Sequence, residues 1–398
     1  MLSKRSNGIT LVALVITIVI LLILAGISIS TLTNTGIFQK AKDAKQKSED
    51  AALKQNEVLD SYEEEIGKVS GAKEYTSAKT IEEVQSDDML TKKVNSVITD
   101  DYGNKITVPA GFKIKKDDTT NNAITVNQGI VIADKDENEF VWVPVGTIYT
   151  STKHTASNTK IIDLKRYKFD GTEDEFSGNY VEEDRGDTTV TLKKLGNAIG
   201  KNITDFKNSV LKNGGYYIGR YEAGVTGYDE NNIKTNNSNN EKSWTGYINA
   251  NGQKIQLVSK TNQQVWNYVT QNKAAELSQN MYNSNKFTSD LINSYAWDTA
   301  IMFIQKCTDK INYAEQNRGE NKSFLNTGKT KDNPCNIFDM ASNVVELTTE
   351  TFLDYGYPCV NRGGVFYDDN FCANGRGRNS IFYSSDSIGF RPILYIND

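Results

Sequence analysis

The sequence has a single histidine, His154, among its 398 residues, and this scarcity excludes several classes of chemistry. Zinc or iron centres that need several imidazole ligands, and catalysis by a Ser-His-Asp triad, have almost nothing to be built from. The four cysteines contain no Cys-x-x-Cys spacing. A zinc ribbon and a thioredoxin-type redox motif are therefore excluded as well.

Cysteine is scarce and lies only in the last quarter of the chain, at Cys307, Cys335, Cys359 and Cys372. In an extracytoplasmic domain an even number of cysteines suggests one or two disulfides, and four cysteines allow three pairings. Buried free thiols are the alternative interpretation. The sequence does not choose between them.

The chain also lacks an excess of basic residues, with a net charge of -5 and a pI near 5.3. A nucleic-acid partner is excluded on this ground, because binding to a phosphate backbone needs a dense face of lysine and arginine. With 398 residues, of which 38% are apolar, the chain has room for a membrane anchor plus one large or two medium domains.

What the sequence does have is a long uncharged segment near its start. The 21 residues from Ile9 to Ile29 are apolar or small, which matches the ~20 residues that an α-helix needs to cross a bilayer. Lys4 and Arg5 precede it, as expected for an N-terminus on the cytoplasmic side. We expect a single-pass membrane protein whose C-terminal part lies outside the cytoplasm, at the cell surface or on a pilus.

Gly8 lies before the apolar segment rather than after it, unlike the cleavage site of an ordinary secretory signal. This order resembles the leader of type IV prepilins and pseudopilins. The resemblance implies that a prepilin peptidase cuts after Gly8 and leaves Ile9 as the new first residue, a position that is N-methylated in that family. Ala13 occupies the place of the family's acidic residue, which puts polymerisation in doubt more than cleavage. A plain single-pass anchor is the alternative.

Four regions follow from composition and periodicity. They are a leader at 1–8, a transmembrane and stalk helix at 9–68, a linker with short elements at 69–108, and a globular domain at 109–398. Within the last region the patterns predict a β-hairpin, a strand and two amphipathic helices. Their expected bounds are 129–132 and 140–145 for the hairpin, 215–222 for the strand, and 263–282 and 288–307 for the helices.

Three C-terminal motifs, together with earlier segments in the same order, carry a second resemblance. They are Asn336–Thr348, Arg362–Phe366 and Ile388–Pro392, preceded by Phe140–Pro144, Tyr217–Glu222 and a helix around Tyr295–Trp297. This pattern resembles the formylglycine-generating (sulfatase-modifying factor) family, and it spans roughly 109–398. It implies that family's C-type-lectin-like fold. The expected fold class is therefore α+β, with a long N-terminal transmembrane and stalk helix followed by that domain.

The same resemblance implies a calcium ion at the turn of the first motif. Asp339 and Glu346 would be side-chain ligands, and Ser342 and Val344 would contribute carbonyl oxygens, a sound donor set for a hard cation. A purely hydrogen-bonded turn is the alternative. Two acidic clusters, 173–175 and 182–184, are interpreted as solvated loop faces rather than calcium sites.

Two further features of the C-terminal motifs have structural interpretations. Gly363 and Gly364 permit a close approach between strands that a Cβ atom would prevent. Arg391 is interpreted as a semi-buried guanidinium that pins the terminal strand through hydrogen bonds to backbone carbonyls.

Enzymes of this family depend on two cysteines that bind copper(I) in the segment after Arg-Gly-Gly. Here only Cys372 is near, and Asp368 stands where the second thiolate would be. A lone thiolate cannot supply the two-sulfur copper site, and the iron-dependent relatives need a histidine cluster. Neither copper nor iron is expected, and the domain is interpreted as non-catalytic.

The final interval, 351–398, contains no Lys, Glu, Gln, Met or Trp and is rich in Tyr, Phe, Asn, Asp, Ser, Gly and Arg. Rigid aromatics mixed with small polar groups are typical of paratopes. The interval predicts a ligand-binding surface, and some relatives are diversified in this region. The static surface of an ordinary domain is the alternative. The predicted contact residues are Tyr367, Asp368, Asp369, Asn370, Phe371, Asn374, Arg376, Arg378, Phe382, Tyr383 and Asp386.

These patterns together predict a membrane-anchored, pilin-like surface protein that displays a non-catalytic domain for a protein or glycan ligand. Its other partners would be the membrane, a prepilin peptidase and other pilin-like subunits. One alternative is a copper oxidase acting on a peptide cysteine. Another is a structural subunit of a pilus or pseudopilus.

Overall fold

The computed structural model describes residues 76–182, 203–226, 255–316, 323–353, 356–368 and 370–397. The predicted leader, 1–8, and the predicted transmembrane and stalk helix, 9–68, lie outside the described residues. The described residues belong to one compact unit of the chain, Tyr75–Asp398.

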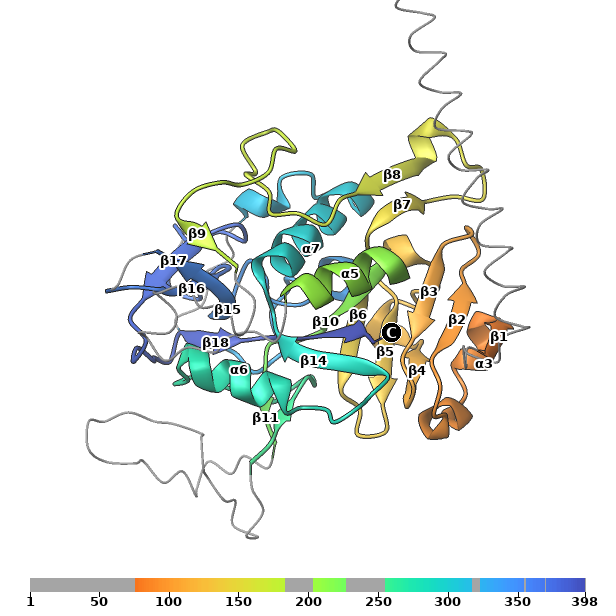
Figure 1. Ribbon diagram of the computed structural model, residues 1–398, viewed down its shortest axis with the longest axis horizontal. Helices are drawn as coiled ribbons and strands as arrows, with labels where there is room; N and C mark the ends of the chain where they lie inside the picture. Colours follow the sequence, from red (N-terminus) through yellow and green to blue (C-terminus); the bar gives the residue numbers. More distant parts are fainter. Residues whose placement is uncertain are drawn as a thin grey trace, which may run out of the picture. The chain divides into compact units, whose positions relative to one another are not determined.

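A six-stranded sheet forms the centre of this unit (Figure 1). Its two middle strands, β10 and β6, consist of residues that are all buried, as expected for strands covered on both faces. Helices α5 (Ile203–Asn213) and α7 (Ser294–Cys307) pack on these strands. In the order β14-β19-β10-β6-β5-β4, the strands are Phe287–Leu291, Pro392–Ile396, Gly215–Gly219, Glu139–Pro144, Val131–Asp134 and Phe112–Lys115.

The predicted hairpin is confirmed, since β5 and β6 pair antiparallel. The Asp134 carboxylate closes the turn by accepting hydrogen bonds from the backbone N–H groups of Asp136 at 2.9 Å and Asn138 at 2.8 Å. The signal was local, because two β-rich segments flank a short polar turn, and local hydrogen bonds complete it. The predicted strand at 215–222 is confirmed as β10, although it ends at Gly219.

A second sheet, in the order β17-β16-β15-β18, carries most of the predicted contact residues or the loops that hold them. β15 pairs antiparallel with β16 and parallel with β18, and the short β9 pairs with its far end. The strands are Arg376–Asn379, Cys359–Arg362, Val345–Phe352 and Ile388–Phe390, with β9 at Tyr180–Val181.

Three smaller sheets complete the β-structure among the described residues. Residues 76–108, assigned above to a linker with short elements, contain the first of them, and Ile98, Ile106 and Val108 belong to the main hydrophobic cluster. The strands are β1 (Thr76–Lys79), β2 (Ser96–Thr99) and β3 (Lys105–Val108); β7 (Gly146–Tyr149) and β8 (Thr159–Ile162); and β11 (Gly224–Val225), β12 (Leu257–Val258) and β13 (Gln264–Val265).

Helices are few and mostly short. Besides α5 and α7, the described residues contain α3 (Ile81–Val84) and α6 (Gln271–Gln279). The two amphipathic helices predicted at 263–282 and 288–307 are therefore confirmed in part, because their first residues form β13 and β14 instead. The 3₁₀ turns are Asp87–Thr91, Asp118–Thr120, Val126–Gln128, Ala156–Asn158, Tyr313–Glu315 and Pro334–Asn336.

The predicted fold class is wrong. An α+β protein with a long N-terminal helix before a C-type-lectin-like domain was expected, but the described residues form mainly β-sheets with few helices. Within those residues no helix has the length and apolar character that crossing a bilayer requires. Local periodicity assigned residues 288–291 to a helix, whereas pairing of these residues with the distant β19 makes them part of a strand.

The structural interpretations of Arg391 and of the glycine pair are confirmed. Arg391 is fully buried and donates hydrogen bonds to the carbonyl oxygens of Gly219 at 2.9 Å and Phe338 at 2.7 Å. Gly363 has a φ of +93°, and a Cβ atom on Gly364 would overlap the carbonyl group of Ala341. The backbone of the C-terminal motifs is thus packed against the turn at 339–344.

Replacing Gly364 by alanine is expected to destabilise the fold by ~3 kcal/mol, because the added methyl group meets backbone that cannot move aside. A matched control is Gly171→Ala, where nothing lies within 4 Å of the added atom and only the positive φ of +87° opposes it. That variant should lose ~1 kcal/mol. Urea denaturation followed by tryptophan fluorescence measures both. Equal losses would contradict the packing argument.

Candidate functional site

Exposed aromatic side chains gather in one part of the chain. Among the described residues the exposed aromatics are Tyr357, Tyr367, Phe382 and Tyr383, with exposed fractions of 58%, 59%, 81% and 48%. All four come from the loops around β16 and β17 or from the segment that precedes β18. We call these loops and β17, residues 356–386, the candidate face.

The predicted contact residues differ in how far they reach solvent. Asn370, Arg378 and Asp386 are exposed, like the three predicted aromatics Tyr367, Phe382 and Tyr383. Asp368, Phe371, Asn374 and Arg376 are partly buried, and Asp369 lies outside the described residues. The predicted contact residues therefore divide into an exposed subset and a partly buried subset.

Two of the partly buried residues have clear local roles. The Asp368 carboxylate accepts hydrogen bonds from the backbone N–H of Asn370 at 2.9 Å and from its side-chain amide at 2.7 Å. Phe371 packs against the second hydrophobic cluster, which includes Val365 and Phe366. Both contacts shape the loop that displays Tyr367.

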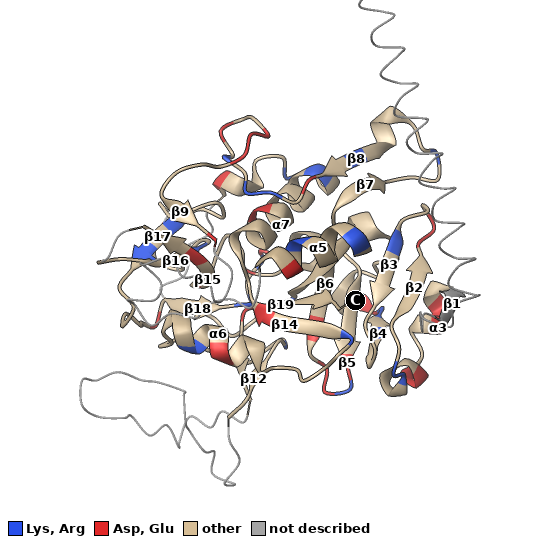
Figure 2. Ribbon diagram, viewed as in Figure 1, with Lys and Arg blue, Asp and Glu red and all other residues tan. Residues whose placement is uncertain are grey.

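Arg376 is engaged inside the protein rather than at its surface. Its guanidinium donates to Asp298 at 2.6 Å and to Glu350 at 3.2 Å. Arg362, the cross-strand neighbour of Arg376, also pairs with Asp298. Figure 2 shows the basic residues of β17 close to an acidic residue of β15. These ion pairs tie two strands of the candidate face to helix α7, and sequence analysis missed both carboxylates.

Aromatic rings from two other segments of the chain lie over the guanidinium groups of the β17 arginines. The guanidinium of Arg376 lies 3.9 Å from the ring centroid of Phe176, and that of Arg378 lies 4.3 Å from the ring centroid of Phe352. Tyr180 of β9 packs in turn against Phe352, with 4.7 Å between the centroids and an angle of 56° between the ring planes. Cation–π contacts of this kind hold the guanidinium groups in one orientation.

Glu182 closes the network beneath β15. It was interpreted above as part of a solvated loop, but its carboxylate accepts hydrogen bonds from the backbone N–H of Ser294 at 2.5 Å and from the hydroxyl of Thr349 at 2.7 Å. Burial and the neighbouring Glu350 carboxylate raise the pKa of Glu182 to about 7. The interpretation of this residue was wrong because its partners are more than a hundred positions away in sequence.

The turn predicted to hold calcium is filled by hydrogen bonds between protein groups. Asp339 accepts from the Thr330 hydroxyl and the Gly328 backbone, and Glu346 pairs with Arg391 at 2.9 Å. Ser342 lies in the same buried turn, and the backbone N–H of Val344 donates to Glu222. Within the described ranges, no group of three or more His, Cys, Asp or Glu is placed to hold a metal. Calcium at this turn stays a prediction.

Three buried carboxylates, Glu222, Asp339 and Glu346, surround the single guanidinium of Arg391. Burial raises the pKa of all three, and the mutual repulsion of the carboxylates adds to the shift for Glu222. Protonation of these carboxyl groups can therefore neutralise the negative charge that Arg391 alone does not compensate.

The structure decides between the two interpretations that the sequence left open, because all four cysteines are free thiols; Cys335 and Cys359 are buried, and Cys307 and Cys372 are partly buried. Burial raises the pKa of Cys307 and of Cys359 to about 12, which keeps both thiols protonated at neutral pH. Cys372 donates to the side-chain oxygen of Asn374 at 2.9 Å. Its sulfur thus helps to shape the loop before β17.

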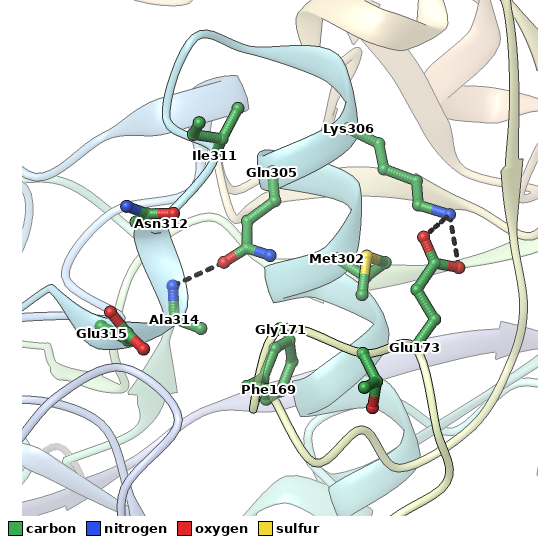
Figure 3. Close-up of a pocket in the computed structure, with 11 residues that line it drawn as sticks. Phe169, Gly171, Glu173, Met302, Gln305, Lys306, Ile311, Asn312, Ala314 and Glu315 are labelled. Atoms are coloured by element: carbon green, nitrogen blue, oxygen red, sulfur yellow. Dashed lines mark hydrogen bonds and ion pairs between the residues drawn. The ribbon is translucent and has the colours of Figure 1, made fainter.

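A separate pocket of about 400 Å³ lies between α7 and the loops at 169–173 and 311–315 (Figure 3). Phe169 and Met302 form its apolar part. On one side Lys306 pairs with Glu173 at 2.7 Å, and on another Gln305 accepts from the backbone N–H of Ala314 at 2.8 Å. None of the predicted contact residues lines this pocket.

Comparison with known proteins adds little. No family model matches the chain, and no curated protein matches it. Among solved structures it is similar to CarF, with 18% identity over 28% of this chain and a TM-score of 0.23, and it spans about half (49%) of that chain. It is also similar to Treponema denticola variable protein 1, with 14% identity over 65% of this chain and 96% of that chain, and a TM-score of 0.24. TM-scores this low establish neither a shared fold nor a shared function.

The raised pKa of Glu182 predicts how stability varies with pH. The folded protein holds a proton that the unfolded chain releases near pH 4.5, so the stabilisation is complete below that pH and is lost as the pH rises through about 7. The loss should reach ~3 kcal/mol. Glu182→Gln, which cannot ionise, should match the wild type near pH 4 and exceed it in stability near pH 8.

Urea denaturation at both pH values measures this difference. The exposed Glu175 provides the matched control, because Glu175→Gln should leave the wild-type profile unchanged. The pKa values of Glu222 and Asp339 are also raised in the folded protein, so the stability of Glu182→Gln should still fall to some extent as the pH rises. If the free energies of unfolding of Glu182→Gln and the wild type differ by the same amount at both pH values, the raised pKa is not that of Glu182.

Proposed function

We propose that this chain is a membrane-anchored surface protein whose C-terminal domain binds a macromolecular ligand through the candidate face without catalysing a reaction. The observation that carries the proposal is the gathering of the exposed aromatic side chains, among the described residues, within 357–383. The protein is not proposed to be a copper oxidase. Burial keeps the thiols of Cys307 and Cys359 protonated, and no second cysteine lies beside Cys372 to complete the two-sulfur copper site of the formylglycine-generating family.

Composition and exposure together favour a protein ligand. Interface cores are depleted in lysine and glutamate and enriched in tyrosine, phenylalanine and arginine, and 351–398 has this composition. Solvent-exposed rings such as Phe382 and Tyr383 leave apolar area uncovered, which a partner would remove from water. Aromatic residues of this kind act as hot spots in protein interfaces.

The support beneath the face suits a binding role. Arg362 and Arg376 are fixed by Asp298 and Glu350, so the strands that carry the loops are held before any ligand arrives. Preorganisation lowers the entropy lost on binding, because fewer groups become ordered at that moment.

Anchoring rests on the sequence. The segment from Ile9 to Ile29 has the length of a membrane span, and Gly8 precedes it as in prepilins. We propose cleavage by a prepilin peptidase after Gly8, methylation at Ile9, and presentation of the domain outside the cytoplasm. Ala13 replaces the acidic residue that pairs subunits in that family, which argues against assembly with other pilin-like subunits.

Removing the exposed rings is expected to abolish binding without unfolding the domain. Peptides selected from a random phage-displayed library on the immobilised full-length chain serve as the probe. The double variant Phe382→Ser, Tyr383→Ser should weaken their binding more than about tenfold, because hot-spot aromatics supply most of the binding free energy. Its thermal unfolding midpoint should stay close to that of the wild type.

The matched control is Ile161→Ser, Ile311→Ser, which removes exposed apolar side chains, 57% and 70% exposed, from outside the candidate face. This variant should bind the selected peptides like the wild type. Peptides that bind the aromatic variant as strongly as the wild type would contradict the proposed function.

Processing of the N-terminus provides a separate test. Mass spectrometry of the protein isolated from membranes should find a mature chain that starts at Ile9 and carries a methyl group. Gly8→Ala should be retained at full length, since the resemblance assigns the cleavage to that glycine. A wild-type chain that still starts at Met1 would contradict cleavage after Gly8 and favour the alternative, a plain membrane anchor.

A further inference from the structure

The arginines of the C-terminal interval separate into two groups. From 351 to 398 the sequence contains Arg362, Arg376, Arg378 and Arg391 and no lysine. Three of these guanidinium groups are buried and paired, Arg362 and Arg376 with Asp298 and Glu350, and Arg391 with Glu346. Arg378 differs from them, because it is exposed and no carboxylate within the described ranges pairs with it.

Arg378 is nevertheless held in place. Its guanidinium carbon lies over the ring of Phe352, 4.3 Å from the ring centroid, and Tyr180 of β9 packs against that ring. Pairing of Arg378 with Val360 across the sheet fixes the backbone. A guanidinium that stacks through its face keeps the N–H donors at its edge available for a planar acceptor.

The geometry points to a carboxylate as the group that the candidate face recognises, and we propose that Arg378 binds an aspartate or glutamate side chain of a protein partner. The inference rests on the proposed function and names the chemistry of its ligand. Carboxylates match the guanidinium fork and form two parallel charge-assisted hydrogen bonds with it.

A nucleic acid or another polyphosphate fits the same surface poorly. Such ligands need several cations, whereas Arg378 is the one exposed cation that 351–398 supplies within the described residues. The exposed Asp386 and the chain's net charge of -5 also oppose a polyanion. A single carboxylate flanked by apolar groups carries the charge that one guanidinium can balance.

The test uses the same full-length chain and the same phage-displayed random peptides. Selected peptides should contain an Asp or Glu, and its change to Asn or Gln should weaken binding at least about tenfold. Arg378→Gln should weaken binding by a similar factor, and the two changes together should cost little more than either alone. Arg378→Lys should recover part of the loss. Lys153→Gln, which removes an exposed cation elsewhere, should have no effect.

Phe352→Leu examines the positioning of the guanidinium. It should weaken binding of the acidic peptides but not of their amide versions, because only the carboxylate uses Arg378. Arg378 is exposed, so the fold of Arg378→Gln should be intact, and its thermal unfolding midpoint verifies this.

Two results would overturn the inference in distinguishable ways. Peptides whose binding depends on Phe382 and Tyr383 but not on Arg378 would refute the carboxylate assignment and leave the proposed function standing. Peptides whose binding depends on none of these residues would refute both.

Discussion

The ion pairs of Asp298 are the interaction on which the candidate face depends. This carboxylate projects from α7 and accepts from Arg362 of β16 and Arg376 of β17, while Glu350 of β15 pairs with the same two arginines. Buried charges of this kind must be paired, since an uncompensated one costs several kcal/mol. The second sheet is therefore locked to a helix that also packs on the central sheet.

In this arrangement, residues that stabilise the candidate face and residues that are exposed on it lie within a few positions of each other in the sequence. Arg376 and Arg378 lie two positions apart on β17, yet Arg376 pairs with the buried carboxylate of Asp298, whereas Arg378 is exposed and lies over the ring of Phe352. The exposed rings on neighbouring loops stand on strands that the ion pairs already hold. A surface of this design can present varied side chains without loss of the fold, because the contacts that stabilise it lie beneath.

Prediction from sequence succeeded where the signal was local. The hairpin at 131–144, the strand β10 and helix α7 follow from alternation, turn residues and helical spacing over a few positions. The glycine pair at 363–364 and the buried Arg391 were also interpreted correctly. The fold class was wrong, because the described residues form mainly β-sheets with few helices. Residues 288–291, for example, were assigned to a helix but pair with a strand a hundred residues later.

By itself, the sequence determined the chemistry available: one histidine, one cysteine shortly after the Arg-Gly-Gly motif, an apolar N-terminal segment, and a final interval with aromatics and arginine but no lysine or glutamate. Only the tertiary structure decided which of those groups face solvent. The sequence does not distinguish the role of Arg376 from that of Arg378, and it places Glu182 in an acidic cluster that is typical of a solvated loop. Their roles differ because their partners, Asp298, Phe352 and Ser294, come from distant segments that chain folding brings together.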